Sequence, residues 1–468
     1  MRRILDLSSN NDQRRKQNNT LAAAVVTSFM TTLNSSALNL SIPGIGSDFG
    51  VSAQAVGWVV TIYALASVAL SLPFGRLADL TSRVKVMRLG VLVFTAGCVS
   101  AVFAVNFSFF ITMRLVQGIG AAMIFSTSSA VLIGAFPASD RGRVLGLSVC
   151  ATYIGLSTGP VVGGFLNSMY GWRSVLVLVS AVGLASLYMT WLRLPSDGGS
   201  LRAAREMDWL SSALYSAGLV SLMYGISEIG SGGHSLVLSA AGLIILAVFL
   251  RRQLKLDNPL LKVSLFASSR SFTYSNLAAL MNYAATFAMS YLMSIYLQII
   301  RGIPSRYAGI ILISAPLMQA VISPAAGRLS DRHSPYKLSS AGMGFCAAAL
   351  LLLCTLDGDA SLARIVINLA IMGVGFGFFS SPNTNAIMSS VSREDSGVAS
   401  SIVATMRNLG QTLSMAIVTV VVSMNLGAAS LEAADPAGVL GVIRLCFAIF
   451  SAICAAGIFA ALMRSDKE

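Results

Sequence analysis

The chain has 468 residues, of which 55% are hydrophobic and only 11% are charged. Its mean hydropathy is +0.75, which excludes a soluble globular protein. Many apolar runs exceed the roughly 20 residues that a helix needs to cross a bilayer. We therefore predict an all-α polytopic membrane protein, in which every span is a helix because no backbone polar group can be left unpaired in lipid.

Fourteen apolar runs follow one another along the chain, and each is predicted to form one membrane helix. They cover residues 20–43, 55–75, 86–106, 108–136, 142–166, 173–193, 208–228, 235–252, 272–298, 306–327, 338–356, 362–385, 396–425 and 439–463. No small-residue cleavage site closes the first run, so we expect it to stay as an uncleaved helix. An even number of spans places both termini on the same side of the membrane.

The basic residues predict which side that is. Most of the 32 lysines and arginines lie in the two tails or in loops on the same side as the tails. The opposite loops hold only Arg173, Arg301, Arg306 and Arg364. Because basic loops are retained in the cytoplasm, we predict a multi-pass protein of the cell membrane with both termini cytoplasmic. The net charge of +13 is then a matter of topology and argues little for a nucleic-acid partner.

One loop pattern occurs twice. The second and third runs are joined by GRLADLTSRVK, starting at Gly75, and the tenth and eleventh by GRLSDRHSPYK, starting at Gly327. A repeat of this kind predicts two related six-helix halves, residues 1–195 and 266–468, with two inserted helices in a linker at 196–265. Pro335 stands in the second copy where the first has Arg83, so we expect the loop of Asp79 to matter more than that of Asp331.

Polar residues within two runs are candidates for substrate contact. Arg114 and Gln117 are three residues apart and share a helix face. A cation at mid-membrane costs about 2.5–3.5 kcal/mol, so Arg114 should face the interior of the helix bundle. The alternative is a structural arginine capped by carbonyls of neighbouring helices. Arg407 and Gln411 are four apart and form a second polar face, for which packing and substrate contact are both open.

The fifth run carries a glycine pattern, G-x8-G-x3-G-P-x2-G-G. Small residues let two helix backbones approach closely, and a proline bends a helix. We expect this face to pack against a helix of the other half and to part from it during a cycle; ordinary glycine packing is the alternative. The pattern consists of Gly146, Gly155, Gly159, Pro160, Gly163 and Gly164.

These features resemble the major facilitator superfamily. The repeated loop is similar to its signature between helices 2 and 3, and the fifth run is similar to the antiporter signature of its export branches. The inserted helix pair resembles the fourteen-helix drug:proton antiporter branch. The resemblance implies the major facilitator fold and a mid-membrane site between the halves that opens alternately to either side. It also implies a cavity role for Arg114 in proton transfer and a conformational lock by Asp79 with Arg83, for which the alternative is a solvated ion pair worth little.

The first helix departs from that branch. Drug antiporters of the branch carry an aspartate where this chain has Asn34, and an asparagine cannot carry a proton. The coupling group is therefore open among Glu228, Asp79 and the substrate itself. A buried Arg114 without a nearby carboxylate would favour anionic, zwitterionic or neutral substrates over permanent cations. Three further candidates for substrate contact are aromatic or amide groups inside apolar runs, which need partners: Tyr63, Asn282 and Asn383.

The sequence thus predicts a secondary transporter that exports small amphipathic compounds, coupled to an ion gradient with protons as the candidate ion. The alternatives are an importer or uniporter of a polar or anionic metabolite and a membrane receptor or scaffold that does not transport. The glycine pattern and the first loop favour transport. No nucleophile–base pair, metal-ligand spacing or phosphate loop occurs, so we expect no enzyme, cofactor or metal. Expected partners are the substrate and the lipid bilayer, with the chain acting as a monomer.

Overall fold

The computed structural model describes residues 2–39, 41–51, 53–195, 206–227, 234–256, 259–261, 263–303, 305–392, 394–426 and 435–462, and its regular secondary structure in these ranges is helical throughout. The chain forms two compact units. Unit 1 comprises Met1–Trp209 and Val391–Ala404, and unit 2 comprises Leu210–Ser390 and Thr405–Glu468. The three-part division drawn from the sequence stays a prediction.

Unit 1 contains the helices of the first predicted half. They are α1 (Arg2–Asn39), α2 (Ile42–Phe49), α3 (Ala53–Leu80), α4 (Arg83–Val102), α5 (Phe107–Ala135), the 3₁₀ turn η1 (Ala138–Asp140), α6 (Arg141–Tyr170), α7 (Trp172–Tyr188) and the π-helical end η2 (Met189–Arg193). Side-chain caps set several of the starts. For example, the Ser82 hydroxyl accepts the amide of Lys85 (3.0 Å) at the start of α4, and Asn106 accepts the amide of Phe109 (2.8 Å) at the start of α5.

Most of the remaining helices belong to unit 2. They are α8 (Trp209–Ser227), α9 (His234–Gln253), α10 (Ser264–Ser268), α11 (Arg270–Thr286), α12 (Met289–Ile295), the π-helix η4 (Tyr296–Ile300), α13 (Ser305–Leu312), α14 (Ser314–Arg332), α15 (Pro335–Cys354), α16 (Leu362–Ser389), α17 (Ser396–Leu426) and α18 (Pro436–Leu462). Helix α17 is shared, because Val391–Ala404 belong to unit 1 and Thr405 onward to unit 2. The ninth predicted run is built from α11, α12 and η4 in succession.

The lengths of these helices fit a membrane protein. Thirteen helical segments of the described residues are long and apolar enough to cross a membrane. Helix α17 covers the remaining predicted run, residues 396–425. The fold class predicted from the sequence, an all-α polytopic membrane protein, is confirmed.

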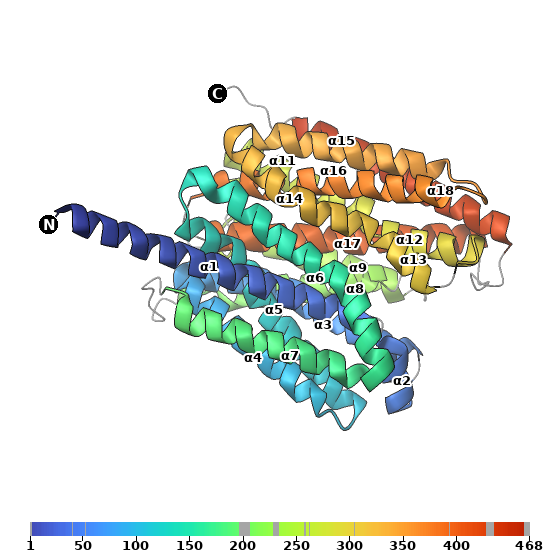
Figure 1. The fold of residues 1–468 in the computed structure, drawn as a ribbon, viewed down its shortest axis with the longest axis horizontal. Coiled ribbons are helices and arrows are strands. Elements are labelled where there is room, and N and C mark those ends of the chain that lie inside the picture. The colour runs from blue at the N-terminus through green and yellow to red at the C-terminus, as the bar shows by residue number, and fades with distance from the viewer. Residues whose placement is uncertain are drawn as a thin grey trace. The chain divides into compact units, whose positions relative to one another are not determined.

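The glycine face of α6 packs within unit 1, against α1, and the two helices lie side by side (Figure 1). A Cβ atom added at Gly155 would lie 2.8 Å from the carbonyl oxygen of Phe29, and one added at Gly163 would lie 2.7 Å from that of Ala37. The prediction that this face packs against a helix of the other half is therefore wrong for these glycines. These glycines contact α1 instead, because small residues of α1 leave room for the two helix backbones to approach closely.

Unit 2 has a core of apolar side chains from α11, α12, α15, α16 and α18, including Met343, Leu369 and Phe447. Two glycines, Gly342 and Gly375, bring α15 and α16 together, since a Cβ on either would lie within 3 Å of the other helix's backbone. The inserted helices α8 and α9 pair in the same way, with Gly242 facing the backbone of α8 at Leu222. Both inserted helices thus use the close packing that is common in membranes.

Candidate substrate and gating sites

Arg114 lies on α5 and is the largest fully buried side chain of the described residues, at 1% exposure. Its Nε donates to the carbonyl oxygen of Val59 (2.8 Å), and its Nη1 donates to Oε1 of Gln117 (2.6 Å). The guanidinium carbon stands 4.6 Å from the centre of the Tyr63 ring, within cation–π range. The alternative of a structural arginine capped by backbone carbonyls is met in part, because the carbonyl oxygen of Val59 accepts from the guanidinium.

Gln117 joins Arg114 to helix α1. Its Oε1 also accepts a hydrogen bond from Nδ2 of Asn34 (3.3 Å), and its own Nε2 donates to the carbonyl oxygen of Gly97 (3.1 Å). Four of the predicted substrate residues therefore meet in unit 1: Asn34, Tyr63, Arg114 and Gln117. The Oδ1 atom of Asn34 is buried and has no hydrogen-bond partner in the described part of the chain.

The charge of Arg114 is not balanced by an acid within this cluster. Its hydrogen-bond and cation–π partners among the described residues are Val59, Gln117 and Tyr63, and none of them is a carboxylate. Asn34 carries no charge, so the buried cation is held by dipoles and a ring face, which gives the surroundings a positive potential.

A second polar cluster lies in unit 2, where α11 meets α16. Nδ2 of Asn383 donates to the carbonyl oxygen of Ser275 (3.2 Å), and Nδ2 of Asn276 donates to that of Phe272 (2.9 Å). The side-chain oxygens of Ser275, Asn276 and Asn383 are buried without a hydrogen-bond partner among the described residues. Buried polar atoms of this kind are seldom left unpaired, so the cluster has capacity for an added hydrogen-bonding group.

Asn276 was missed by the sequence reasoning, although it is an amide inside an apolar run, the same signal that selected Asn282. Asn282 itself lies further along α11, fully buried beside the Cys346 thiol. Arg407 and Gln411 stand one turn apart on α17 and are half-buried. The backbone acceptors of Arg114 and Gln117 carry no signal in the sequence, because any residue can supply a carbonyl.

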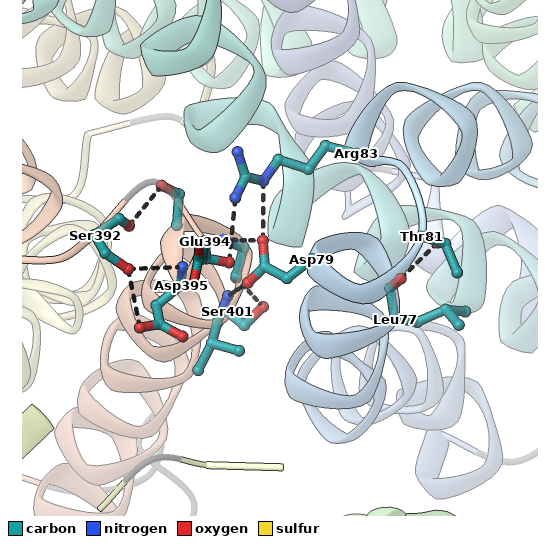
Figure 2. A network of polar contacts seen from close by, with 11 residues as sticks. Leu77, Asp79, Thr81, Arg83, Ser392, Glu394, Asp395 and Ser401 are labelled. Carbon is teal, nitrogen blue, oxygen red and sulfur yellow. Dashed lines mark hydrogen bonds and ion pairs between the residues drawn. The ribbon is translucent and has the colours of Figure 1, made fainter. Parts of the chain in front are cut away.

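Asp79 holds the start of α17 (Figure 2). Its Oδ1 accepts the amide of Gly397 (2.8 Å) and Nε of Arg83 (2.9 Å), and its Oδ2 accepts the amide of Val398 (2.8 Å). The side chain of Asp79 is only 2% exposed. The alternative of a solvated ion pair is therefore wrong, since the carboxylate is buried against the positive end of a helix dipole.

Two facing glycines make this contact possible. A Cβ on Gly397 would lie 2.6 Å from Oδ1 of Asp79 and 2.7 Å from the carbonyl oxygen of Gly75, and a Cβ on Gly75 would run into Ser401. Arg83 adds a bond from Nη2 to the carbonyl oxygen of Glu394 (3.2 Å). We call these five residues, Gly75, Asp79, Arg83, Gly397 and Val398, the α17 clamp.

The second copy of the loop is built differently. Helix α15 begins at Pro335, the position at which α4 begins with Arg83, and proline suits a first helical turn because its missing N–H has no helical partner anyway. No guanidinium can therefore bind Asp331 from that position.

Among the remaining predicted residues, Gly164 lies on α6. Glu228 and the side chain of Pro160 fall outside the described residues.

Buried polar side chains on membrane-length helices are typical of multi-pass carriers. The sequence matches the family model described as Major Facilitator Superfamily over residues 24–415 and 275–468, and the chain belongs to that family. Its members are transporters and not enzymes, and they work in a membrane on small-molecule substrates. The predicted family is thereby confirmed.

Several relatives are similar over most of their length. The riboflavin transporter RibZ of Clostridioides difficile is 30% identical over 83% of this chain and 84% of its own. The multidrug resistance protein Stp of Mycobacterium tuberculosis is 28% identical over 83% of this chain and 73% of its own. Among solved structures, the human organic anion transporter MFSD10 has a TM-score of 0.66 at 14% identity, covering 96% of this chain and 99% of that one. At that identity the likeness establishes the fold alone.

Proposed function

We propose that this protein exports small amphipathic compounds across the cell membrane by alternating access, driven by an ion gradient. Relatives named as multidrug resistance proteins support export of varied compounds. The observation that carries the substrate preference is the buried guanidinium of Arg114, which has no carboxylate among its contacts in the described residues. The preferred compounds are anionic, zwitterionic or neutral, because a permanent cation would meet an uncompensated positive charge.

The size of that charge effect is large enough to decide selectivity. Two unit charges 4 Å apart interact by about 4 kcal/mol at an effective dielectric of 20. A difference of 1.4 kcal/mol already changes affinity about tenfold. Asn34 adds no charge and leaves its Oδ1 buried without a partner among the described residues. In a state of the cycle that opens this cluster, a substrate N–H or O–H would bind there while its anionic group approaches Arg114.

The test is transport in vesicles that contain the purified protein, with and without a pH gradient, over anionic, neutral and permanently cationic dyes. We expect export of the anionic and neutral dyes. Asn34→Asp should shift selectivity towards cations and raise the dependence on the pH gradient, while Arg114→Ala should abolish transport of anions first. Wild-type export of quaternary ammonium dyes that Asn34→Asp leaves unchanged would contradict the charge argument.

A second candidate is transport of a planar heteroaromatic compound such as riboflavin, which the 30% identity to a riboflavin transporter favours. Riboflavin is neutral and rich in hydrogen-bonding groups, so it is compatible with an amide-rich site. Uptake of riboflavin into inverted and right-side-out vesicles distinguishes this candidate and also gives the direction. If riboflavin neither moves nor competes with the dyes, the second candidate is excluded.

A further inference from the structure

Unit 1 contains a cavity of about 320 Å³ away from the Arg114 cluster. It lies where the first turns of the α1 span, the start of α4, the end of α5 and the chain after η2 come together. All four are ends of membrane-spanning segments, so the cavity is at the level of the lipid headgroups. Its lining consists of Gln13, Lys16, Gln17, Thr20, Arg83, Val84, Ala130, Val131, Gly134, Ala135, Leu194 and Pro195.

The electrostatics of this cavity favour an anion. No lining residue is acidic. Lys16 has no ion-pair partner among the described residues, and Arg83 is paired with Asp79. Arg88 binds only carbonyl oxygens in the described part of the chain, those of Thr190 (2.8 Å) and of the lining residue Leu194 (2.6 Å), so its charge is also uncompensated. The start of α4, at Arg83 and Val84, adds the positive end of a helix dipole.

The deeper wall of the cavity is apolar. Val84, Val131 and Leu194 are buried and belong to one hydrophobic cluster. Lys16 and Gln13 are exposed and form the rim. A cavity with a cationic rim and an apolar wall between membrane helices fits a ligand that carries a phosphate next to a hydrocarbon group.

We propose that this cavity binds a phosphate group of net negative charge, with Lys16 as the main contact and Arg88 as a second source of positive potential. An anionic phospholipid of the adjacent leaflet supplies such a group together with acyl carbon for the apolar wall. A soluble phosphate compound is the other source of the same chemistry. The proposal does not depend on the direction of transport or on the substrate.

The experiment uses the full-length protein in detergent and measures binding by native mass spectrometry and thermal stability. The probes are phosphatidylglycerol, phosphatidylcholine and inorganic phosphate. Lys16→Gln should weaken phosphatidylglycerol binding at least tenfold. Arg15→Gln is the matched control, since it removes the same charge one position away on α1, from an exposed residue that does not line the cavity; it should weaken binding less than twofold.

A second variant fills the cavity without altering its charge. Gly134 lines the cavity, and a Cβ added there would meet nothing within 4 Å, so Gly134→Leu should fold. It should also weaken phosphatidylglycerol binding at least tenfold. If phosphatidylglycerol binds and inorganic phosphate does not, the site is assigned to lipid. If inorganic phosphate binds and is weakened by the same variants, the site is assigned to a soluble phosphate compound. Equal loss in Lys16→Gln and Arg15→Gln, full retention in Gly134→Leu, or equal binding of phosphatidylcholine would overturn the proposal.

Discussion

At the scale of single residues, Gln117 holds the candidate substrate site in unit 1 together. One side-chain amide accepts from Arg114 and Asn34 and donates to the carbonyl of Gly97. Both its oxygen and its nitrogen are therefore in use, and the guanidinium keeps a fixed position because the amide on the next helix turn is fixed. The orientation of the amide follows from these partners, since a reversed amide would point N–H groups at Arg114.

We expect Gln117→Leu to lower the free energy of unfolding by about 2–4 kcal/mol, because it leaves a buried cation and a buried carbonyl without their partner. Gln117→Glu keeps an oxygen for Arg114 and Asn34 and adds a carboxylate that pairs with the guanidinium, while it loses the bond to Gly97, so its net effect should be smaller. Thermal unfolding in detergent measures both. If the two variants unfold at the same temperature as the wild type, Gln117 does not anchor the arginine.

At the scale of helices, glycines let helix backbones approach closely in unit 1. Gly159 has Ser36 and Ala37 of α1 against it, and a Cβ added there would lie 2.6 Å from Cβ of Ser36 and 2.9 Å from the amide nitrogen of Ala37. Backbone atoms cannot move aside as a flexible side chain can. The contact between α1 and α6 is therefore part of the folding of unit 1, whatever it contributes to a transport cycle.

Gly159→Ala should consequently destabilise the protein by about 1–3 kcal/mol through overpacking. Gly344→Ala, on α15, is the control, because a Cβ there would meet nothing within 4 Å. Alanine is the better helix former by about 1 kcal/mol, so the control should be neutral or stabilising. Equal melting temperatures for the two variants would show that α1 and α6 can move apart enough to accept a Cβ at position 159 without loss of stability.

The short helix α2 is tied to the start of α7 by Asp48. Its Oδ2 accepts Nε1 of Trp172 (2.9 Å) and Nη1 of Arg173 (2.6 Å), and Phe49 packs on the Trp172 ring at 5.6 Å. The hydrogen bond from Trp172 and then the interaction with Arg173 lower the pKa of the Asp48 carboxyl below its ordinary value of 3.8. This tie needs the ionised carboxylate.

A lowered pKa in the folded protein means that the stabilisation is complete above the unfolded value and is lost as the pH falls through the folded value. The difference in melting temperature between wild type and Asp48→Asn should thus be constant from about pH 7 to about pH 5 and shrink below the ordinary value of 3.8. Asp359→Asn serves as control, because its side chain is fully exposed and such pairs contribute little. A difference that grows on acidification would refute this linkage.

At the scale of the whole molecule, α17 has its first residues in unit 1 and the rest in unit 2. The α17 clamp holds the unit 1 part through two backbone amides and an ion pair. Within unit 2 the same helix accepts the amide of Ala288 at Ser414 (3.0 Å) and bonds Tyr215 at Thr405 (2.8 Å). We propose that opening of the clamp frees the start of α17 during the transport cycle.

Asp79→Asn should weaken the clamp by up to about 2 kcal/mol, because it removes a charge from a helix N-terminus, and so raise the open population by up to about thirtyfold. The readout is the labelling rate of Ser401→Cys, a buried position on α17, with the six native cysteines replaced. Asp331→Asn, the equivalent change in the second loop, should leave the rate unchanged. Similar rates for both aspartate variants would exclude a special role for Asp79.

The orientation in the membrane is also testable. Asp12→Cys places an exposed thiol in the N-terminal tail, which is predicted to be cytoplasmic, and Asp359→Cys places one in a loop predicted to be external. In intact cells an impermeant reagent should label only the cysteine at position 359. Labelling at position 12 would reverse the predicted topology.

The helices and the cluster around Arg114 could be predicted because they rest on side chains: apolar runs, a lone buried cation, an amide three residues on. The partner of the α6 glycines could not be, since glycine records a close approach but not the helix that makes it. The amides of Gly397 and Val398 were invisible for a related reason, as every residue except proline has one. The difference between the two loops could be predicted, because Arg83 and Pro335 occupy the same helix-start position. Arginine can pair with the aspartate of its loop, whereas proline cannot.

The α17 clamp also constrains how this chain can drift under mutation. Asp79 binds the N–H of Val398 and takes nothing from its side chain, so the clamp itself accepts any residue there that keeps an amide. Burial of the Val398 side chain restricts the position to apolar residues. Gly397 has no such freedom, because Asp79 and Gly75 occupy the space of its missing Cβ. Because the clamp joins backbone amides on one side to a carboxylate on the other, it can be retained in relatives that share few residues with this chain. At position 398, only proline would remove the amide that Asp79 binds.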